Sequence, residues 1–232
     1  MEEGDVLVLE RKDMFQVLIC GDIEQDDTYQ EFLSVLPEKV DIVYSDPPWN
    51  PGNATYWRTQ AGKQPCKSYT LFLDRFCSYV SACIDRGAMD IFTEQSYNDK
   101  HRNMFIRAVK RANWGLPLIE EWSVYYGSPG SRSVQHPNTL LHFGTDKLST
   151  NPEGLIGEVM TIRVCAGLRD RYRNGSCIVD PCIGKGMTSR MAVYFQWNCI
   201  GIEINPKRLE KTAEWLIRRG RFEITRRWNY KK

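Results

Sequence analysis

The chain has 232 residues, of which 42% are hydrophobic and 26% charged, with 31 basic and 29 acidic side chains. This composition supplies enough apolar material for one domain of residues 1–232 and excludes disordered, fibrous and mini-protein classes. No apolar run approaches the ~18 residues that cross a bilayer. The acidic start Met1-Glu2-Glu3 is unlike a secretory signal, so we expect a soluble, intracellular protein.

Short apolar runs rich in β-branched residues alternate with helical patterns, which predicts a parallel sheet with helices on its faces. The predicted strands are 17–20, 40–44, 88–93, 122–126, 139–143, 177–179 and 199–202. The predicted helices are 29–36, 69–85, 98–113, 154–165, 187–195 and 206–218. Two segments rich in Gly, Pro, Ser, Asn and Gln, 50–67 and 127–138, are predicted loops, and loops on a rigid sheet commonly carry substrate contacts.

The eight cysteines are scattered along the chain and never form a C-x-x-C pair. This spacing fits neither a zinc site nor a disulfide framework, and it is typical of a reducing compartment. The three histidines also lack metal-ligand spacing. We therefore expect free thiols and no bound metal.

An acidic, proline-rich motif follows the predicted strand at 40–44. Its residues are Asp46, Pro47, Pro48 and Trp49. The strand delivers the Asp46 carboxylate to the carboxyl edge of the sheet, where ligands of open α/β folds bind, and the prolines hold the local carbonyl groups outward. The carboxylate and a fixed carbonyl can each accept one hydrogen bond from a planar amine, and Trp49 can stack on its ring. The motif therefore predicts a site that binds and activates an amino group.

The second motif is a strand, a glycine turn and a helix, followed by another strand. Its polar and glycine positions are Asp180, Cys182, Gly184, Gly186, Glu203 and Asn205. The glycines let a ligand approach the backbone closely, and an acid 17 residues after Gly186 is near the spacing at which a carboxylate holds ribose hydroxyl groups. Dinucleotide-binding and P-loop patterns fail at Ser189 and Val179. The site suits a ligand with an amino group at one end and a ribose at the other, such as S-adenosylmethionine.

The two motifs together resemble the amino-group methyltransferases of DNA, in the permuted β class whose D-P-P-Y/W motif precedes the cofactor motif. The resemblance runs from about residue 17 to about residue 216, with motif matches at 18–22, 46–49, 180–188 and 201–205. It implies a Rossmann-like α/β fold with a mostly parallel seven-stranded sheet, helices on both faces and a circularly permuted motif order. It also implies S-adenosyl-L-methionine as the cofactor.

The family pattern implies methylation of adenine N6 in DNA, because the first motif begins with aspartate where N4-cytosine enzymes more often have serine. The amine-activating set is then Asp46, Pro47, Pro48 and Trp49. The cofactor set is Asp22, Asp180, Cys182, Gly184, Gly186, Glu203 and Asn205. In the implied mechanism the target nucleotide is flipped out of the DNA, its base stacks on Trp49, and its amine attacks the methyl group in line without a metal.

The chain also departs from the family pattern. Cys182 stands where the family usually has Phe, and Lys185 where it has Ser or Thr. No insertion is long enough for a full target-recognition domain, so we expect sequence reading by segments 50–67 and 127–138 and by the basic tail 218–232. The candidate substrate contacts in the first segment are Asn50, Tyr56, Trp57, Arg58 and Lys63. The tail holds seven basic residues and one acid, with aromatic rings that can stack on bases.

The expected partner is duplex or single-stranded DNA, with a homodimer or a helper subunit to compensate for the short recognition segments. The expected setting is the cytoplasm of a bacterial or phage-infected cell, in restriction-modification or in a phage. Three alternatives stay open: methylation of adenine in RNA, N4 methylation of cytosine in DNA, and a catalytically silent nucleic-acid-binding subunit.

Overall fold

The computed structural model describes residues 1–126 and 136–232, and within these residues it contains nine strands and seven helices. The strands are β1 (Asp5–Arg11), β2 (Met14–Cys20), β3 (Ile42–Ser45), β4 (Asp90–Ser96), β5 (Leu118–Tyr126), β6 (His136–Phe143), β7 (Cys177–Asp180), β8 (Asn198–Glu203) and β9 (Glu223–Asn229). The helices are α1 (Asp26–Val35), α2 (Pro51–Gln60), α3 (Tyr69–Asp85), α4 (Asp99–Ala112), α5 (Gly157–Leu168), α6 (Met187–Phe195) and α7 (Pro206–Arg218).

All the described strands join one sheet in the order β5-β6-β4-β3-β7-β8-β2-β1-β9. Its centre, from β4 to β2, is parallel, whereas β5, β6, β1 and β9 pair antiparallel at the two sides. The expected seven-stranded, mostly parallel sheet therefore needs correction: the described sheet is larger and mixed. The difference arises because β1 and β9 extend the sheet beyond β2. β1 forms a hairpin with β2, and β9 returns to pair with β1, so both join antiparallel without the crossover connection that a parallel strand needs.

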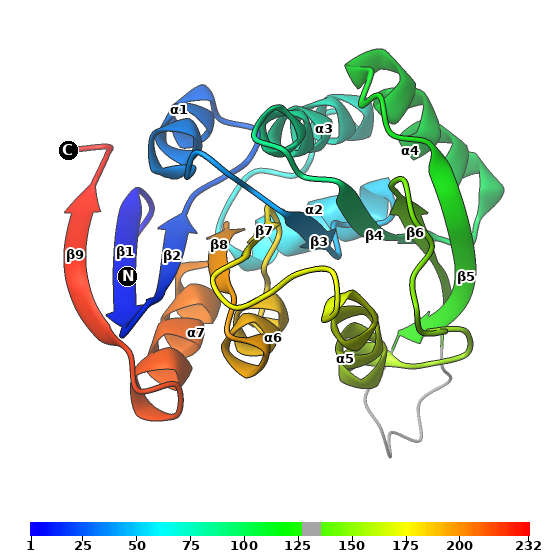
Figure 1. The fold of residues 1–232 in the computed structure, drawn as a ribbon. Helices are drawn as coiled ribbons and strands as arrows, with labels where there is room; N and C mark the ends of the chain where they lie inside the picture. The colour runs from blue at the N-terminus through cyan, green and yellow to red at the C-terminus, as the bar shows by residue number, and fades with distance from the viewer. Residues whose placement is uncertain (127–135) are drawn as a thin grey trace.

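Helices cover both faces of the sheet, as the sequence predicts. Figure 1 shows α1, α3 and α4 on one face and α5, α6 and α7 on the other. Each face packs its own apolar core, one around Phe32, Phe76 and Phe105, the other around Met160 and Leu209. The central parallel strands are buried on both sides, which is why they read as continuous apolar runs. The architecture is thus three layers, helix on sheet on helix.

Every predicted strand and helix coincides with one in the structure, but three elements escaped prediction: β1, α2 and β9. The predicted loop 50–67 contains α2, which begins with Asn50 as its cap and Pro51 in its first turn. In the predicted loop 127–138, residues 136–138 belong to β6. Residues 127–135 lie outside the described part of the chain.

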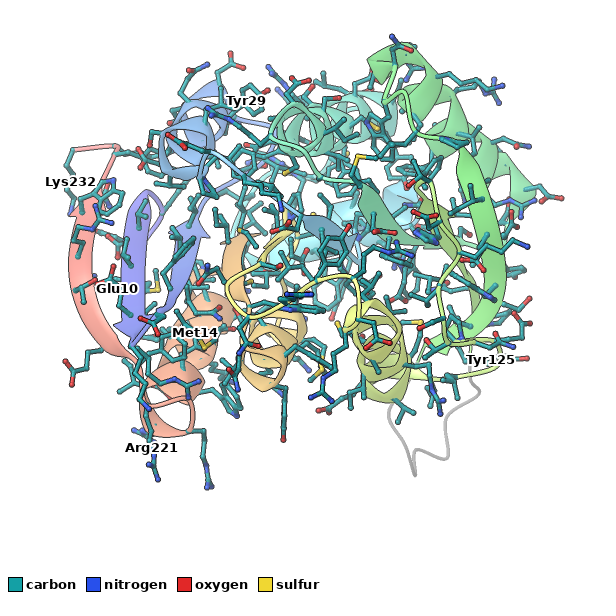
Figure 2. All side chains as sticks on the ribbon, in the orientation of Figure 1. Glu10, Met14, Tyr29, Tyr125, Arg221 and Lys232 are labelled. Carbon is teal, nitrogen blue, oxygen red and sulfur yellow. The ribbon has the colours of Figure 1, made fainter. Side chains whose placement is uncertain are left out.

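The basic tail forms the edge strand β9 rather than a free segment. Its aromatic rings are engaged within the protein: Phe222 is buried, Trp228 Nε1 donates to Glu31 Oε1 at 2.8 Å, and the Tyr230 hydroxyl lies 2.9 Å from Thr28 Oγ1. Burial excludes Phe222 from stacking on a base, whereas stacking by Trp228 and Tyr230, which are partly exposed, stays a prediction. Figure 2 shows Arg221 and Lys232 at opposite ends of β9, with Arg221 at the end where Met14 begins β2.

Among the described helices, none combines the length and the apolar character that a membrane-spanning segment needs.

Candidate active site

A cavity of about 460 Å³ opens at the carboxyl ends of the parallel strands. The acids that line it are Asp22, Asp46, Glu94, Glu158, Asp180 and Glu203. The chain topology explains this gathering, because β3 and β7 are direct neighbours although their residues lie far apart in sequence. Among the described residues, no group of three or more His, Cys, Asp or Glu side chains is arranged to hold a metal ion. The two sequence motifs thus meet in one acidic cavity.

Asp46 follows the last residue of β3 and points into this cavity. Its Oδ1 accepts a hydrogen bond from Trp49 Nε1 at 2.6 Å. Burial, with a smaller contribution from the neighbouring Asp180, raises the pKa of Asp46 to about 7, although the Trp49 hydrogen bond and the Arg208 charge oppose the shift. Trp49 lines the cavity as predicted, but its indole N–H is bonded to the carboxylate. Its stacking on a base stays a prediction.

The two prolines also line the cavity, and the chain around them is fixed from outside. The Pro48 carbonyl accepts a hydrogen bond from the Tyr69 hydroxyl at 2.8 Å, and Tyr69 begins helix α3. Proline allows little backbone freedom, so this tie holds the segment after Asp46 in one conformation.

Asp180 ends β7 and is buried. It accepts three hydrogen bonds, from Ser45 Oγ at 2.7 Å, from Thr188 Oγ1 at 2.6 Å and from the Cys182 backbone N–H at 3.0 Å. Burial nevertheless raises the pKa of Asp180 to about 6, because three dipoles do not replace the lost hydration. A cation bound beside Asp180 would favour its ionised form.

The glycine turn between β7 and α6 has two left-handed positions, Gly184 with φ of 56° and Gly186 with φ of 74°. A Cβ atom on Gly186 would lie 2.4 Å from the Thr212 side chain of α7, so this glycine allows α6 and α7 to pack closely. Gly184 and Cys182 line the cavity, whereas Gly186 does not. Gly184 therefore forms part of the cavity wall, whereas Gly186 allows the close packing of the two helices behind it.

Glu203 ends β8, and Asn205 follows it. Burial raises the pKa of Glu203 to about 7 although the Asn205 backbone N–H donates to its Oε1 at 2.9 Å. Asn205 caps α7 through its side chain and donates from Nδ2 to the Gln60 carbonyl at 3.2 Å. It does not line the cavity, so its position makes it a support for α7 and α2 rather than a wall of the site.

Helix α2 lies over the cavity and brings Trp57 and Arg58 into its wall. Arg58 donates to Asp22 Oδ2 at 2.8 Å and also pairs with Glu24 at 2.8 Å. The guanidinium carbon of Arg208 lies over the Trp57 ring, 4.0 Å from the centre of the ring. The candidate substrate residue Arg58 is thus paired with the candidate cofactor residue Asp22.

The other three candidate substrate residues do not line the cavity. Asn50 caps α2 by accepting from the Asn53 backbone N–H at 2.9 Å. Tyr56 is half exposed and contacts the edge of Trp57, and Lys63 pairs with Glu3. Tyr56 projects from another side of α2 than Trp57 and Arg58, because successive residues of a helix are rotated by about 100°. Asn50 precedes the helix as its cap and Lys63 follows its last residue, Gln60, so α2 carries neither side chain into the cavity.

Sequence reasoning missed Glu94 and Arg208, which both line the cavity. Glu94 is buried and accepts from the Tyr44 hydroxyl at 3.2 Å. Burial and the Asp46 charge raise its pKa well above the usual range. Its position could have predicted this, because Glu94 directly follows the predicted strand 88–93 and so reaches the same sheet edge as Asp46.

Comparison with solved structures finds the same fold. The chain matches M1.HpyAVI in complex with S-adenosylmethionine at 17% identity, covering 82% of this chain and 92% of that one, with a TM-score of 0.54. It matches TTHA0409 of Thermus thermophilus, a proposed DNA modification methylase complexed with S-adenosyl-L-methionine, at 17% identity over 87% and 93% of the two chains, with a TM-score of 0.55. It matches the cytosine-N4-specific PvuII DNA methyltransferase at 15% identity over 85% of each chain, also with a TM-score of 0.55.

The chain shares the fold of solved DNA methyltransferases. No protein-family model and no curated protein sequence matches it. The expected α/β fold of methyltransferases is therefore confirmed, whereas the circularly permuted motif order stays a prediction. Because the sequence identity is low, the roles of individual residues are argued from the geometry of the cavity.

Proposed function

We propose that the chain is an S-adenosylmethionine-dependent DNA methyltransferase that transfers a methyl group to the exocyclic amine of a flipped base, adenine N6 in the first instance. The observation that carries the proposal is the meeting of Asp46 with Asp180 and Glu203 in one cavity at the carboxyl edge of the sheet. The fold it shares with DNA methyltransferases supports the same reaction.

The cavity fits a cationic nucleoside cofactor in its charge and size. Asp180 and Glu203 are buried acids whose pKa values are raised to about 6 and about 7, so a positive partner would favour their ionised forms. S-adenosylmethionine carries an ammonium group, a sulfonium and a ribose, and when bound it supplies a methyl group on a good leaving group. Asp180 would face the ammonium group and Glu203 the ribose hydroxyls.

Asp46 and the segment after it would bind the target amine. The ionised carboxylate accepts one N–H, and the carbonyl of Pro47 accepts the second, so the nitrogen lone pair is directed at the methyl group. Asp46 stabilises the positive charge that develops on nitrogen as the N–C bond forms, and afterwards accepts the released proton. The Trp49 indole bonded to Asp46 must leave the carboxylate when the amine arrives.

Cytosine N4 is the second candidate acceptor, and the likeness to the cytosine-N4-specific PvuII enzyme favours it. Adenine and cytosine present the same amine beside a ring nitrogen, so the Asp46 site accommodates either. The aspartate at the start of the motif, which resembles that of N6-adenine enzymes, places adenine first.

The test is transfer of labelled methyl from S-adenosylmethionine to duplex DNA, single-stranded DNA and RNA in parallel, followed by nucleoside analysis. We expect N6-methyladenine in DNA. Asp46→Asn should lower kcat at least about a hundredfold while cofactor binding persists, because an interaction with developing charge is lost. Glu214→Gln, on the exposed side of α7, is the matched control and should leave kcat unchanged.

Three results would change the proposal. Methylated cytosine in DNA would identify cytosine N4 as the acceptor. Methylated RNA would mean that the substrate is RNA instead of DNA. Cofactor binding with no transfer to any of the three nucleic acids would indicate a silent subunit. Normal turnover by Asp46→Asn would contradict the role of this carboxylate.

A further inference from the structure

Glu94 lines the cavity together with Asp46. Ser45 of β3 pairs with Thr93 of β4 in parallel register, so Asp46 and Glu94 occupy the next positions of two neighbouring strands. Neighbouring strands are about 4.8 Å apart. Both carboxyl groups line the cavity. The fold therefore places a second acid next to the acid of the proline motif.

The surroundings of the two acids differ in a way that decides where a proton resides. Asp46 accepts a hydrogen bond of 2.6 Å from the Trp49 indole, and the positive charge of Arg208 favours its ionised form. Glu94 is more deeply buried, only 6% exposed, and accepts a longer bond of 3.2 Å from the Tyr44 hydroxyl. Two adjacent buried carboxyls cannot both ionise, so the proton remains on Glu94.

The remaining groups around Glu94 support this assignment. Burial, Asp46 and Asp180 of β7 raise its pKa, and hydrogen bonds from the neutral side chains of Tyr44 and Asn138 oppose the shift without reversing it. Glu158, in the first turn of α5, lines the same cavity and carries a further acid. The strongest influences on Glu94 among the described residues include no cation.

The Tyr44 hydroxyl also fixes the orientation of the acid. It donates to Glu94 Oε1 and lies 3.1 Å from Thr161 Oγ1 of α5, so it is held from two sides. Because Oε1 already accepts a hydrogen bond, the acid proton belongs on Oε2. A neutral carboxylic acid with one oxygen occupied is a hydrogen-bond donor of fixed direction.

We propose that Glu94, as a neutral acid, donates its O–H to the ring nitrogen next to the target amine while Asp46 accepts from the amine itself. The proposal rests on the proposed function and specifies how the same site recognises its base. Adenine N1 and cytosine N3 are acceptors beside the amine, whereas guanine carries the N1–H donor beside its amine on the Watson–Crick edge. The acid pair thus admits adenine and cytosine and rejects guanine presented by that same edge.

Infrared spectroscopy tests the acid pair without any nucleic acid. At pH 8 the wild-type protein should show the C=O stretch of a buried protonated carboxyl. The band should vanish in Glu94→Gln and persist in Asp46→Asn, where it should titrate at lower pH because the neighbouring negative charge is gone. A band unaffected by Glu94→Gln, or no band in the wild type, would overturn the assignment of the proton.

A double-mutant cycle tests the contact with the base. Replacing the ring nitrogen of the target base by C–H, as 1-deazaadenine or 3-deazacytosine, should lower kcat/KM of the wild type about tenfold, the usual effect of a lost hydrogen bond. Glu94→Leu should show a similar loss on the normal base and no further loss on the analogue. Glu94→Gln should stay within a few-fold of the wild type because its amide N–H also donates.

Additive losses for Glu94→Leu and the analogue would overturn the contact, and so would a Glu94→Gln variant as impaired as Glu94→Leu. Retained cofactor binding in both variants shows that they fold. If the wild type methylates no nucleic acid, the proposed function fails and the base contact fails with it, while the infrared result still decides whether Asp46 and Glu94 share one proton.

Discussion

Asp180 and Glu203 are buried carboxyls whose pKa values are raised to about 6 and about 7. A cationic cofactor binds their ionised forms better, so binding releases protons. We therefore expect the Kd for S-adenosylmethionine to rise as the pH falls from 8 to 5, by up to about tenfold for each pH unit at which one proton is displaced. Isothermal titration calorimetry in two buffers of different ionisation enthalpy measures both the affinity and the protons released.

Glu203→Gln separates the two acids, because it should remove the part of the pH dependence near pH 7 and keep the part near pH 6. Glu214→Gln, an exposed acid on the neighbouring helix, should change neither part. A Kd independent of pH in the wild type would mean that the acids do not face the cofactor.

At the residue scale, sequence alone locates the acids that follow apolar strands. Asp46, Asp180 and Glu203 each come within two residues of the end of a predicted strand, and parallel strands bring their carboxyl ends to one edge. Glu94 also follows a predicted strand, but the residues around it form no recognisable motif. Arg208 was beyond prediction because its place over Trp57 depends on how α7 meets α2, a tertiary contact.

Helix α2 is the element whose stability decides how the cavity is covered. Asn50→Ala removes the side-chain cap, which costs about 1 kcal/mol. We expect amide hydrogen exchange within α2 to accelerate about fivefold, the factor that corresponds to this free energy. Hydrogen exchange read by mass spectrometry on peptides from 51–60 measures the effect.

Ser68→Ala is the matched control, because Ser68 caps α3 in the same way by accepting from the Leu71 N–H at 3.2 Å. It should accelerate exchange at the start of α3 and leave α2 unchanged. Equal exchange in α2 for Asn50→Ala and the wild type would show that Arg58 and Asn205 hold this helix without its cap.

The elements that sequence patterns predicted are those with strong apolar periodicity, such as α3 and the central strands. Helix α2 escaped because it opens with Pro-Gly-Asn and buries one residue, Ala54, so it shows no apolar stripe. Strand β9 escaped because its residues are mostly exposed and its role comes from pairing with β1, some 220 residues earlier in the chain. Edge pairing of this kind is set by the tertiary fold rather than by local pattern.

For the molecule as a whole, the acidic cavity costs folding free energy. The folded pKa values of Asp46, Asp180 and Glu203 lie at about 7, 6 and 7, above the ordinary carboxyl values of 3.8 and 4.5. Between these limits the folded state holds more protons than the unfolded state, so stability falls as the pH rises. The carboxyls with lowered pKa, Asp5 and Asp90, act in the opposite sense, but only below about pH 4.

We therefore expect the Tm of the protein without cofactor to fall between pH 5 and pH 8 by at least about 3 °C, which corresponds to about 1 kcal/mol for a chain of this size. Asp46→Asn should flatten this slope, because it removes one of the acids that must ionise. S-adenosylmethionine should raise the Tm more at pH 8 than at pH 5, since a cation offsets charges that exist only at the higher pH. Thermal unfolding followed by circular dichroism measures these Tm values. A Tm that rises from pH 5 to pH 8, with the same slope in Asp46→Asn as in the wild type, would mean that ionising the cavity acids does not destabilise the fold.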